Sequence, residues 1–435
     1  TSFIQLAHFP QPQRHLPGCL AIHFERKQQN MKVLQINSVC GVGSTGRIAT
    51  DIHKVLTAQG HTSYVAFGRD KPLNCDEAIR IGSPADYYLH ALLTRLSDRH
   101  GFGSRTATTH FLKKIECLAP DIIHLHNIHG YYINIQLLFQ YLKQTSVPVV
   151  WTLHDCWAFT GHCSYFDYVN CDKWKNICHH CPQKKSYPSS LLLDNSRHNY
   201  LKKKALFAGI KNMTLVTPSS WLGNLTSESY LKEYALKVIN NGIDLNTFRP
   251  IESDFRKRHG LEGQFVILGV ASNWGLRKGL QYFLQLSETL QQDERIVLVG
   301  LSEGQLRGLP KNIIGIIRTN SAKELAEIYS SVDVFVNPTL EDNFPTTNLE
   351  SLACGTPVIT FDTGGSIECV DKDTGFVVEK GNLDKLVYII RMFRLDFTRH
   401  TQMRKNCVAR ARQLYDKNER YKDYITIYQN ALHMN

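Results

Sequence analysis

The sequence alternates short apolar runs with amphipathic stretches, and it does so twice along its length. In the first half the apolar runs include KVLQINS, DIIHLHN and VPVVWTL, separated by segments with helical periodicity. In the second half FVILGVAS, ERIVLVG, VFVNP and PVITF are separated in the same way. Buried strands that alternate with helices form parallel sheets covered by helices. The pattern therefore predicts two doubly wound α/β domains, joined near the turn-rich stretch VINNGIDLNTFRP.

Chain length and local composition divide the sequence into four parts. With 435 residues, the chain is longer than one hydrophobic core usually organises. We expect residues 31–240 to form the first α/β domain, residues 241–410 the second, and residues 411–435 a last helix that packs back on the first domain. Residues 1–30 mix His, Arg, Pro and Gln before the first strand-like run, MKVLQINSV, and we interpret them as an extension outside the fold.

The distribution of charge limits the kinds of molecule that the chain is expected to bind. Lys and Arg outnumber Asp and Glu by 50 to 39, and nearly all of the excess lies before Pro250. A basic first half suits nucleic acid, an anionic membrane surface or a phosphate-linked acceptor, and is equally a feature of an ordinary soluble surface. No motif of an RNA-binding module accompanies it, so we expect no nucleic-acid partner. Because no apolar run approaches the roughly 18 residues of a membrane helix, we expect a cytoplasmic protein, at most peripheral at the inner face of the cell membrane.

The loops that follow the strands are the candidate sites, because ligands of open α/β sheets bind beyond the carboxyl ends of the strands. The first strand runs into CGVGSTGR, where Gly43 and its neighbours either let the backbone approach a ligand or form a tight turn without one. His154 ends another strand, and it can bond a substrate hydroxyl, transfer a proton or satisfy neighbouring backbone. Arg277 and Lys278 lie at a helix start, where cations oppose the helix dipole, so a bound diphosphate explains them better than a solvated helix end.

The stretch EDNFPTTNLESLACG combines a helix start with carboxylates. Thr346 or Thr347 can cap the helix, and the backbone N–H groups of Thr347 and Asn348 can bind a phosphate. Glu350, about one turn into the helix, can accept hydrogen bonds from the vicinal hydroxyls of a ribose. Asp342, in the preceding loop, can accept from sugar hydroxyls on the other side of the phosphate. The arrangement suits a nucleoside diphosphate sugar.

These motifs together resemble the donor site of the family-4 retaining glycosyltransferases. DNFPTTNLE, SLACGTPVI and TGGSIE carry the resemblance, with GVGSTGR, DIIHLHN, TLHD, TPSSWL, NGIDLNTFRP, RKG and ELAEIYSSVDVFVNPT, in the family's order from Met31 to about Leu386. The resemblance implies the GT-B fold, two Rossmann-like domains that face each other across a cleft. It also implies transfer of a sugar, with retained configuration and without a catalytic metal, from a UDP- or GDP-sugar. The implied acceptor is a glycan or a polyprenyl-linked molecule, as in bacterial capsule, exopolysaccharide and O-antigen biosynthesis.

The family marks its donor site with two acidic residues eight positions apart, which are Asp342 and Glu350 in this sequence. The resemblance implies that Glu350 binds the ribose of the nucleotide. It implies that Asp342 contacts the donor sugar in place of a usual Glu, with a side chain one methylene shorter. Glu341 is out of register with this pair.

The resemblance also assigns roles to the basic residues and the strand-end histidine. Arg277 and Lys278 match the phosphate-binding region, where they would neutralise the leaving diphosphate. Asn273 replaces an Arg of many relatives, so Arg277 would supply the missing charge. His154 matches a histidine near the transferred sugar, and Gly43 lies in the loop that approaches the diphosphate.

A cysteine-rich insertion over residues 156–188 follows His154. Four cysteines lie within nineteen residues: Cys163, Cys171, Cys178 and Cys181. In a chain without a secretory signal, such density favours structural zinc over disulfides, although the first two spacings are loose for a zinc knuckle. The alternative is a compact insertion without metal.

Other interpretations remain open at this stage. A GT-B sugar-nucleotide isomerase would also bind a nucleotide sugar between two domains, and a non-catalytic protein could bind a nucleotide sugar or nucleic acid through the basic half. The stretch YYLHALLTRLSDRHGFGSRTATTHFLKKI is basic and apolar on one face. It suits either an anionic membrane surface or an ordinary pair of surface helices.

Overall fold

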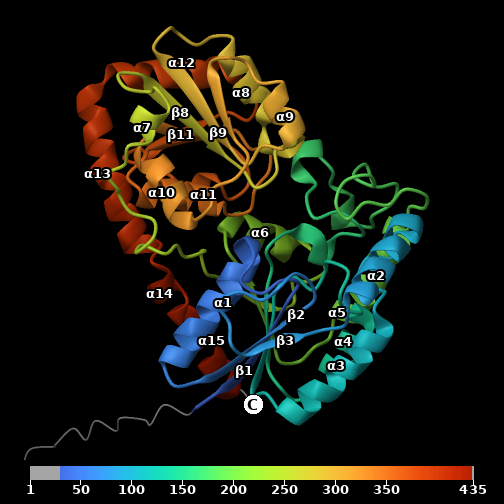
Figure 1. The fold of residues 1–435 in the computed structure, drawn as a ribbon. Coiled ribbons are helices and arrows are strands. Elements are labelled where there is room, and N and C mark those ends of the chain that lie inside the picture. Colours follow the sequence, from blue (N-terminus) through green and yellow to red (C-terminus); the bar gives the residue numbers. More distant parts are fainter. Residues whose placement is uncertain (1–29, 434–435) are drawn as a thin grey trace, which may run out of the picture. The chain divides into compact units, whose positions relative to one another are not determined.

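The structure of the protein, a computed structural model, describes residues 30–433. Two sheets of parallel strands organise these residues, which confirms the architecture that the alternating pattern predicts (Figure 1). The predicted extension over residues 1–30 lies outside the described residues, apart from Asn30.

The first sheet has seven parallel strands in the order β3-β2-β1-β4-β5-β6-β7. Its strands are β1 (Lys32–Asn37), β2 (Thr62–Phe67), β3 (Ala78–Arg80), β4 (Ile122–Leu125), β5 (Val149–Thr152), β6 (Met213–Thr217) and β7 (Ala235–Val238). Its helices are α1 (Gly43–Ala58), α2 (Pro84–Ser97), α3 (Arg105–Leu118), α4 (Ile135–Leu142), α5 (Ser196–Phe207) and α6 (Ser220–Glu228).

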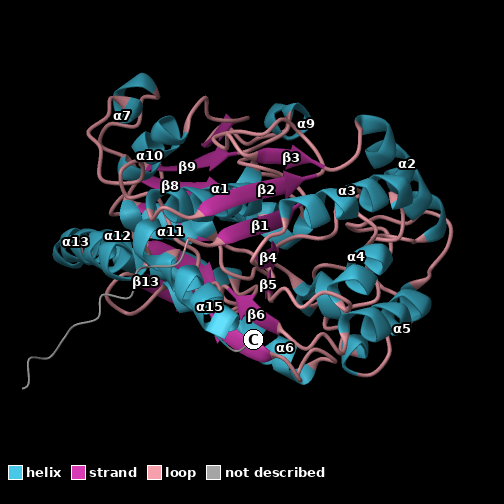
Figure 2. Cartoon of the chain, turned by 90° about the horizontal axis from the view of Figure 1, so that it is seen from below, coloured by secondary structure: helices cyan, strands magenta, loops and turns pink. Residues whose placement is uncertain are grey.

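Helices cover both faces of this sheet, which explains why most residues of its central strands are apolar (Figure 2). On β1, Leu34 and Ile36 belong to a cluster that includes side chains of α3 and α4. Val33, which points to the other face, packs with Ile48 and Ile52 of α1. Alternate residues of one strand therefore contribute to two cores.

The second sheet has six parallel strands in the order β10-β9-β8-β11-β12-β13. Its strands are β8 (Phe265–Val270), β9 (Glu294–Val299), β10 (Ile313–Ile316), β11 (Val334–Asn337), β12 (Val358–Phe361) and β13 (Gly375–Val378). The helices of this part are α7 (Phe255–Arg258), α8 (Leu280–Ser287), α9 (Glu303–Arg307), α10 (Ala322–Ser330), α11 (Thr346–Ala353), α12 (Leu383–Leu395) and α13 (Phe397–Leu414). Among the residues that the structure describes, none of the helices has the length and apolar character that a membrane crossing needs.

The end of the described chain returns to the first sheet through α14 (Lys417–Arg420) and α15 (Lys422–His433), which lies beside α1 (Figure 1). Tyr424 and Tyr428 of α15 pack in the same cluster as Val33. The Tyr428 hydroxyl lies 2.7 Å from Nδ1 of His124 on β4. Tertiary packing and a buried hydrogen bond therefore hold this helix to the first sheet.

Hydrogen bonds also join the loops of the two sheets. The carboxylate of Glu368, which follows β12, accepts from the backbone N–H groups of Ser220 and Trp221, each at 2.8 Å. These two N–H groups belong to the first turn of α6, where the helix dipole favours an anion. A residue of the second domain therefore caps a helix of the first.

Candidate functional site

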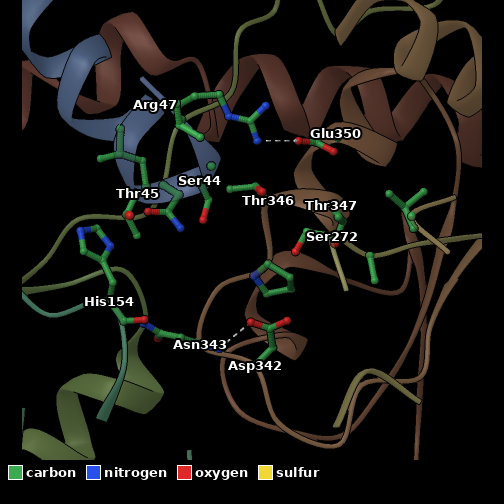
Figure 3. Close-up of a pocket in the computed structure, with 18 of the residues that line it drawn as sticks. Ser44, Thr45, Arg47, His154, Ser272, Asp342, Asn343, Thr346, Thr347 and Glu350 are labelled. Carbon is green, nitrogen blue, oxygen red and sulfur yellow. Dashed lines mark hydrogen bonds and ion pairs between the residues drawn. The ribbon is translucent and has the colours of Figure 1, made fainter. Parts of the chain in front are cut away.

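A cavity of about 630 Å³ lies where the loops after the strands of the two sheets meet. Figure 3 shows side chains from both sheets around it. Eight of the residues predicted from the sequence line this cavity: Gly43, His154, Arg277, Lys278, Asp342, Thr346, Thr347 and Glu350. Residues more than 300 positions apart in the chain thus share one site.

Asn348 is the predicted residue that does not line the cavity. Its backbone N–H donates to the carbonyl of Pro345, at 3.1 Å, so this N–H is already paired. Its side chain is fully buried and donates to the hydroxyl of Ser366, at 3.1 Å, and it accepts from Asn337, at 2.8 Å. Asn348 therefore ties the start of α11 to its neighbours, and the phosphate-binding N–H expected of it is not free.

Glu350 extends from α11 toward the first sheet. Its side chain is only 3% exposed, and the Tyr329 hydroxyl donates to its Oε2 at 3.2 Å. Nη2 of Arg47, on α1, lies 3.8 Å from Oε1, and the two side chains point toward one another (Figure 3). Burial raises the pKa of Glu350 to about 7, although Arg47 and Tyr329 favour the carboxylate. A buried carboxylate with one weakly held cation is suited to exchange that cation for the hydroxyl groups of a ligand.

Two cations and Asp342 lie together on the second sheet's side of the cavity. Lys278 forms an ion pair with Oδ2 of Asp342. Burial opposes ionisation of Asp342, yet Lys278 and Arg277 hold its pKa below the usual range. The Arg277 guanidinium lies 3.9 Å from the ring centre of Tyr165 and donates to the carbonyl of Glu341 at 2.6 Å. The cations are therefore held in place before any anion binds.

Glu341 points away from the cavity and contacts the cysteine-rich insertion. Its two carboxylate oxygens accept from the backbone N–H groups of Phe166, at 3.2 Å, and Tyr168, at 3.1 Å. Burial raises the pKa of Glu341 to about 7, although these two donors lower it. The carboxylate that is out of register in the sequence therefore anchors the insertion to the second sheet.

Asn343, which the sequence analysis did not single out, connects the two halves of the site. Its Nδ2 donates to the backbone carbonyl of His154 at 3.1 Å, and its Oδ1 accepts from the hydroxyl of Ser219 at 2.5 Å. Gly365 makes this packing feasible, since a Cβ at that position would lie 1.9 Å from the carbonyl oxygen of Asn343. The residues GG of TGGSIE were the sequence signal for this close approach.

His154 is held by a second histidine. Its Nε2 lies 3.1 Å from Nδ1 of His126, and the two rings are nearly parallel. Burial lowers the pKa of His154 to about 4, so the imidazole is neutral at physiological pH. A neutral imidazole can donate or accept a hydrogen bond but does not supply a positive charge.

Two family models match the chain, one on each sheet. The model described as "Glycosyltransferase Family 4" matches residues 45–247, and the model "Glycosyl transferases group 1" matches residues 264–393. The chain belongs to glycosyltransferase family 4. The resemblance seen in the motifs is thereby confirmed.

Curated relatives of this glycosyltransferase include bacterial enzymes of glycan assembly. WcaC of Escherichia coli (strain K12), provisionally named as a colanic acid biosynthesis glycosyl transferase, is 24% identical over 92% of this chain and 100% of its own length. The N,N'-diacetylbacillosaminyl-diphospho-undecaprenol alpha-1,3-N-acetylgalactosaminyltransferase of Campylobacter jejuni is 27% identical over 46% of this chain and 56% of its own.

Solved structures confirm the GT-B fold of the glycosyltransferase. The sucrose-phosphate synthase of Thermosynechococcus elongatus matches with a TM-score of 0.72 and 17% identity, over 93% of this chain and 100% of its own. Anabaena Alr3699/HepE in complex with UDP-glucose matches with a TM-score of 0.64 and 17% identity, over 91% of this chain and 100% of its own. At this identity the likeness establishes the fold alone.

The predicted zinc ligands of the glycosyltransferase gather around one small cavity of about 10 Å³. Cys163, Cys171, Cys178 and Cys181 all line it, and each has a free thiol. Sγ of Cys178 accepts from the N–H of Gly161 at 3.2 Å. Within residues 30–433, however, no three side chains of His, Cys, Asp or Glu are already arranged to hold a metal ion. The thiols are neighbours, and zinc remains a prediction.

Proposed function

We propose that this glycosyltransferase moves a sugar, with retained configuration, from a UDP- or GDP-sugar to a glycan or a polyprenyl-linked acceptor in surface polysaccharide biosynthesis. The observation that carries the proposal is the cavity itself. It combines a buried carboxylate, Glu350, two cations, Arg277 and Lys278, and the start of α11. In a nucleoside diphosphate sugar, the ribose needs a hydrogen-bond acceptor and the diphosphate needs cations and N–H donors. The complex of Anabaena HepE with UDP-glucose supports the donor class.

In the proposed complex the ribose hydroxyls donate to Glu350 and displace Arg47. The diphosphate lies against Arg277, Lys278 and the start of α11, where unpaired N–H groups and the helix dipole favour an anion. The same cations stabilise the charge that develops on the leaving diphosphate, and this makes a catalytic metal unnecessary. Asp342, held ionised by Lys278, accepts hydrogen bonds from the donor sugar.

Retention would follow from attack on the face from which the diphosphate leaves. In this scheme a phosphate oxygen takes the proton of the acceptor hydroxyl as the bond to the diphosphate breaks and the new glycosidic bond forms. No protein carboxylate is then required as the base. In this scheme the carboxylates of Asp342 and Glu350 bind hydroxyl groups, and other groups bind the phosphates.

Exposed apolar and basic side chains on the first domain support the proposal that the acceptor is bound to a membrane. Seven large apolar side chains, each at least 44% exposed, form what we call the leucine patch: Tyr88, Leu89, Leu92, Leu96, Leu191, Leu192 and Leu193. The segment with the last three runs beside α2, because the N–H of Leu191 donates to the carbonyl of Arg95 at 2.7 Å. Exposed Arg95 and Arg99 adjoin the patch in sequence. Apolar side chains with basic neighbours suit the inner, anionic face of a cell membrane, where a polyprenyl-linked acceptor is carried. The Campylobacter relative, named for a diphospho-undecaprenol substrate, supports this acceptor class.

A structural zinc ion in the insertion is a separate proposal. Four thiols around one cavity are a suitable donor set for tetrahedral zinc, but they would have to move closer together to bind it. The ion would stabilise the fold of the cysteine-rich insertion, which Glu341 and Tyr165 connect to the second domain. It would take no part in sugar transfer.

The experiment that tests the proposed function is thermal unfolding against a panel of nucleotides and nucleotide sugars, because a ligand of the folded state raises the Tm. A shift with one base identifies the donor class, and incubation of that donor with membrane extract then tests for transfer. Conversion of the donor without an acceptor would instead identify an isomerase. Absence of a shift with every compound would contradict the proposal.

A further inference from the structure

A row of buried hydrogen bonds crosses three neighbouring strands of the first sheet and leads to His154. Gln35 lies on β1, His126 follows β4 and His154 follows β5. Nε2 of Gln35 donates to the carbonyl of Ala49 at 3.0 Å, and Oε1 of Gln35 lies 3.0 Å from Nε2 of His126. Nδ1 of His126 in turn lies 3.1 Å from Nε2 of His154. Both Gln35 and His126 are almost completely buried.

The chemistry of these groups determines where each proton lies. The carbonyl of Ala49 can only accept, so it requires the NH₂ group of Gln35 and leaves the amide oxygen facing His126. That oxygen can only accept as well, so Nε2 of His126 must carry a hydrogen. Whether Nδ1 of His126 also carries a hydrogen depends on the charge of the ring.

His126 is neutral because no group that its ring contacts within residues 30–433 stabilises a positive charge. The groups with which its ring interacts are the amide of Gln35 and the imidazoles of His124 and His154. Burial and these two imidazoles hold the pKa of His126 well below its ordinary value. Its single hydrogen is already on Nε2, so Nδ1 is a bare acceptor and His154 must donate to it from Nε2.

We propose that Gln35 and His126 are positioning residues that fix His154 as the tautomer protonated on Nε2, so that Nδ1 accepts a hydrogen bond from a sugar hydroxyl in the cavity. His154 lines the cavity, and the described residues offer its Nδ1 no hydrogen-bond partner. In the other tautomer Nδ1 would donate, and it would orient the hydroxyl differently. This inference rests on the proposed function only for the identity of the hydroxyl.

The tautomer can be measured without any activity. In protein labelled with ¹⁵N-histidine, a protonated ring nitrogen and a bare one have distinct resonances, and His154→Gln identifies the signals of His154. The expected result is a protonated Nε2 and a bare Nδ1. A protonated Nδ1, or exchange between the two forms, would overturn the proposal.

A variant tests whether the tautomer matters for transfer. In Gln35→Glu the hydrogen bond to the carbonyl of Ala49 is lost, and where the new side chain is ionised, its carboxylate beside Nε2 of His126 favours the imidazolium. The Nδ1–H of that imidazolium requires His154 to accept at Nε2 and to carry its hydrogen on Nδ1. We expect kcat to fall by about tenfold or more and the nucleotide-induced Tm shift to stay unchanged, because the donor's nucleotide is bound elsewhere. Gln264→Glu, in the second domain, is the matched control.

The outcomes separate the two proposals. If the resonances show that the hydrogen of His154 has moved to Nδ1 in Gln35→Glu and kcat is unchanged, the positioning role of Gln35 and His126 is overturned. If the wild-type protein neither binds a nucleotide nor transfers a sugar, the proposed function fails, whereas the nitrogen resonances still decide the tautomer. If Gln35→Glu does not fold, the resonances of the wild-type protein alone decide it.

Discussion

Arg47 and Glu350 form an ion pair that connects the two domains, with Nη2 and Oε1 3.8 Å apart. Arg47 is about half exposed, and an exposed partner at this distance contributes little to stability. The carboxylate of Glu350, in contrast, is buried and has one close hydrogen bond, from Tyr329. Such a pair is suited to the proposed exchange of Arg47 for the hydroxyl groups of a ribose.

The first prediction concerns the affinity for the donor. Glu350→Ala removes the acceptor for both ribose hydroxyls, so we expect the nucleotide to bind at least about tenfold more weakly, the effect of losing about 1.4 kcal/mol. Isothermal titration with the nucleotide identified by thermal unfolding measures this change. Glu262→Ala removes an exposed carboxylate and should leave the affinity as it was. Equal affinities for the wild-type protein and Glu350→Ala would refute the ribose assignment.

The second prediction concerns the pH dependence of binding. Because burial raises the pKa of Glu350 to about 7, the carboxylate that we propose as the acceptor for ribose hydroxyls is only partly formed at neutral pH. Binding of a nucleotide sugar should therefore strengthen as the pH rises from about 6 to about 8. A nucleotide sugar is the better probe, since a free nucleotide has a phosphate that titrates near 6. Glu350→Gln should lose this dependence.

The stability of the unliganded protein should change in the opposite direction. A carboxyl group whose pKa is higher in the folded than in the unfolded state binds more protons when folded. The stability that it contributes is present below about pH 4.5 and falls as the pH rises toward about 7. We expect a smaller fall of Tm over this interval in Glu350→Gln than in the wild-type protein. An identical pH dependence in the two would show that Glu350 titrates normally.

The fold and most of the site could be predicted from the sequence because they depend on local patterns. Alternating apolar strands and helices predict the two sheets, and strand-end loops predict where the cavity lies. Asn343 and Glu341 could not be assigned, because their partners lie more than 120 residues away in the other domain. Asn348 illustrates the opposite error. Its position at a helix start indicated a free N–H, whereas a local hydrogen bond to Pro345 already satisfies it.

The third prediction concerns the anchor of the insertion. Glu341→Ala leaves the backbone N–H groups of Phe166 and Tyr168 without their acceptor, and an unpaired buried polar group costs about 1 to 3 kcal/mol. We expect a lower free energy of unfolding in urea, by about 2 kcal/mol. Limited proteolysis should also cut the insertion faster in this variant. Glu341→Gln keeps one acceptor oxygen, so its free energy of unfolding should lie between those of the wild-type protein and Glu341→Ala. Unchanged unfolding and proteolysis of Glu341→Ala would exclude the anchoring role.

The fourth prediction concerns metal content. If zinc holds the insertion, protein purified under reducing conditions should contain about one zinc ion per chain by elemental analysis. Cys178→Ser and Cys181→Ser should lose the metal and lower the Tm, because a structural zinc site contributes directly to folding. Cys117→Ser, an exposed cysteine on α3, is the matched control. Metal-free protein with an unchanged Tm in Cys181→Ser would establish the compact insertion without metal.

The fifth prediction concerns the membrane. The leucine patch presents apolar side chains from α2 and from the segment beside it, with Leu89 and Leu192 each 66% exposed. Replacing both with Glu removes apolar area and adds negative charge, so both contributions to binding an anionic bilayer are weakened. We expect the wild-type protein to float with vesicles containing phosphatidylglycerol, and Leu89→Glu/Leu192→Glu to remain in solution. The control is Leu395→Glu, because Leu395 is 81% exposed but belongs to α12 of the second domain. Transfer to a water-soluble acceptor analogue should continue in the double variant, since the cavity is untouched. Equal flotation of the wild-type protein and the double variant would show that the patch does not contact lipid.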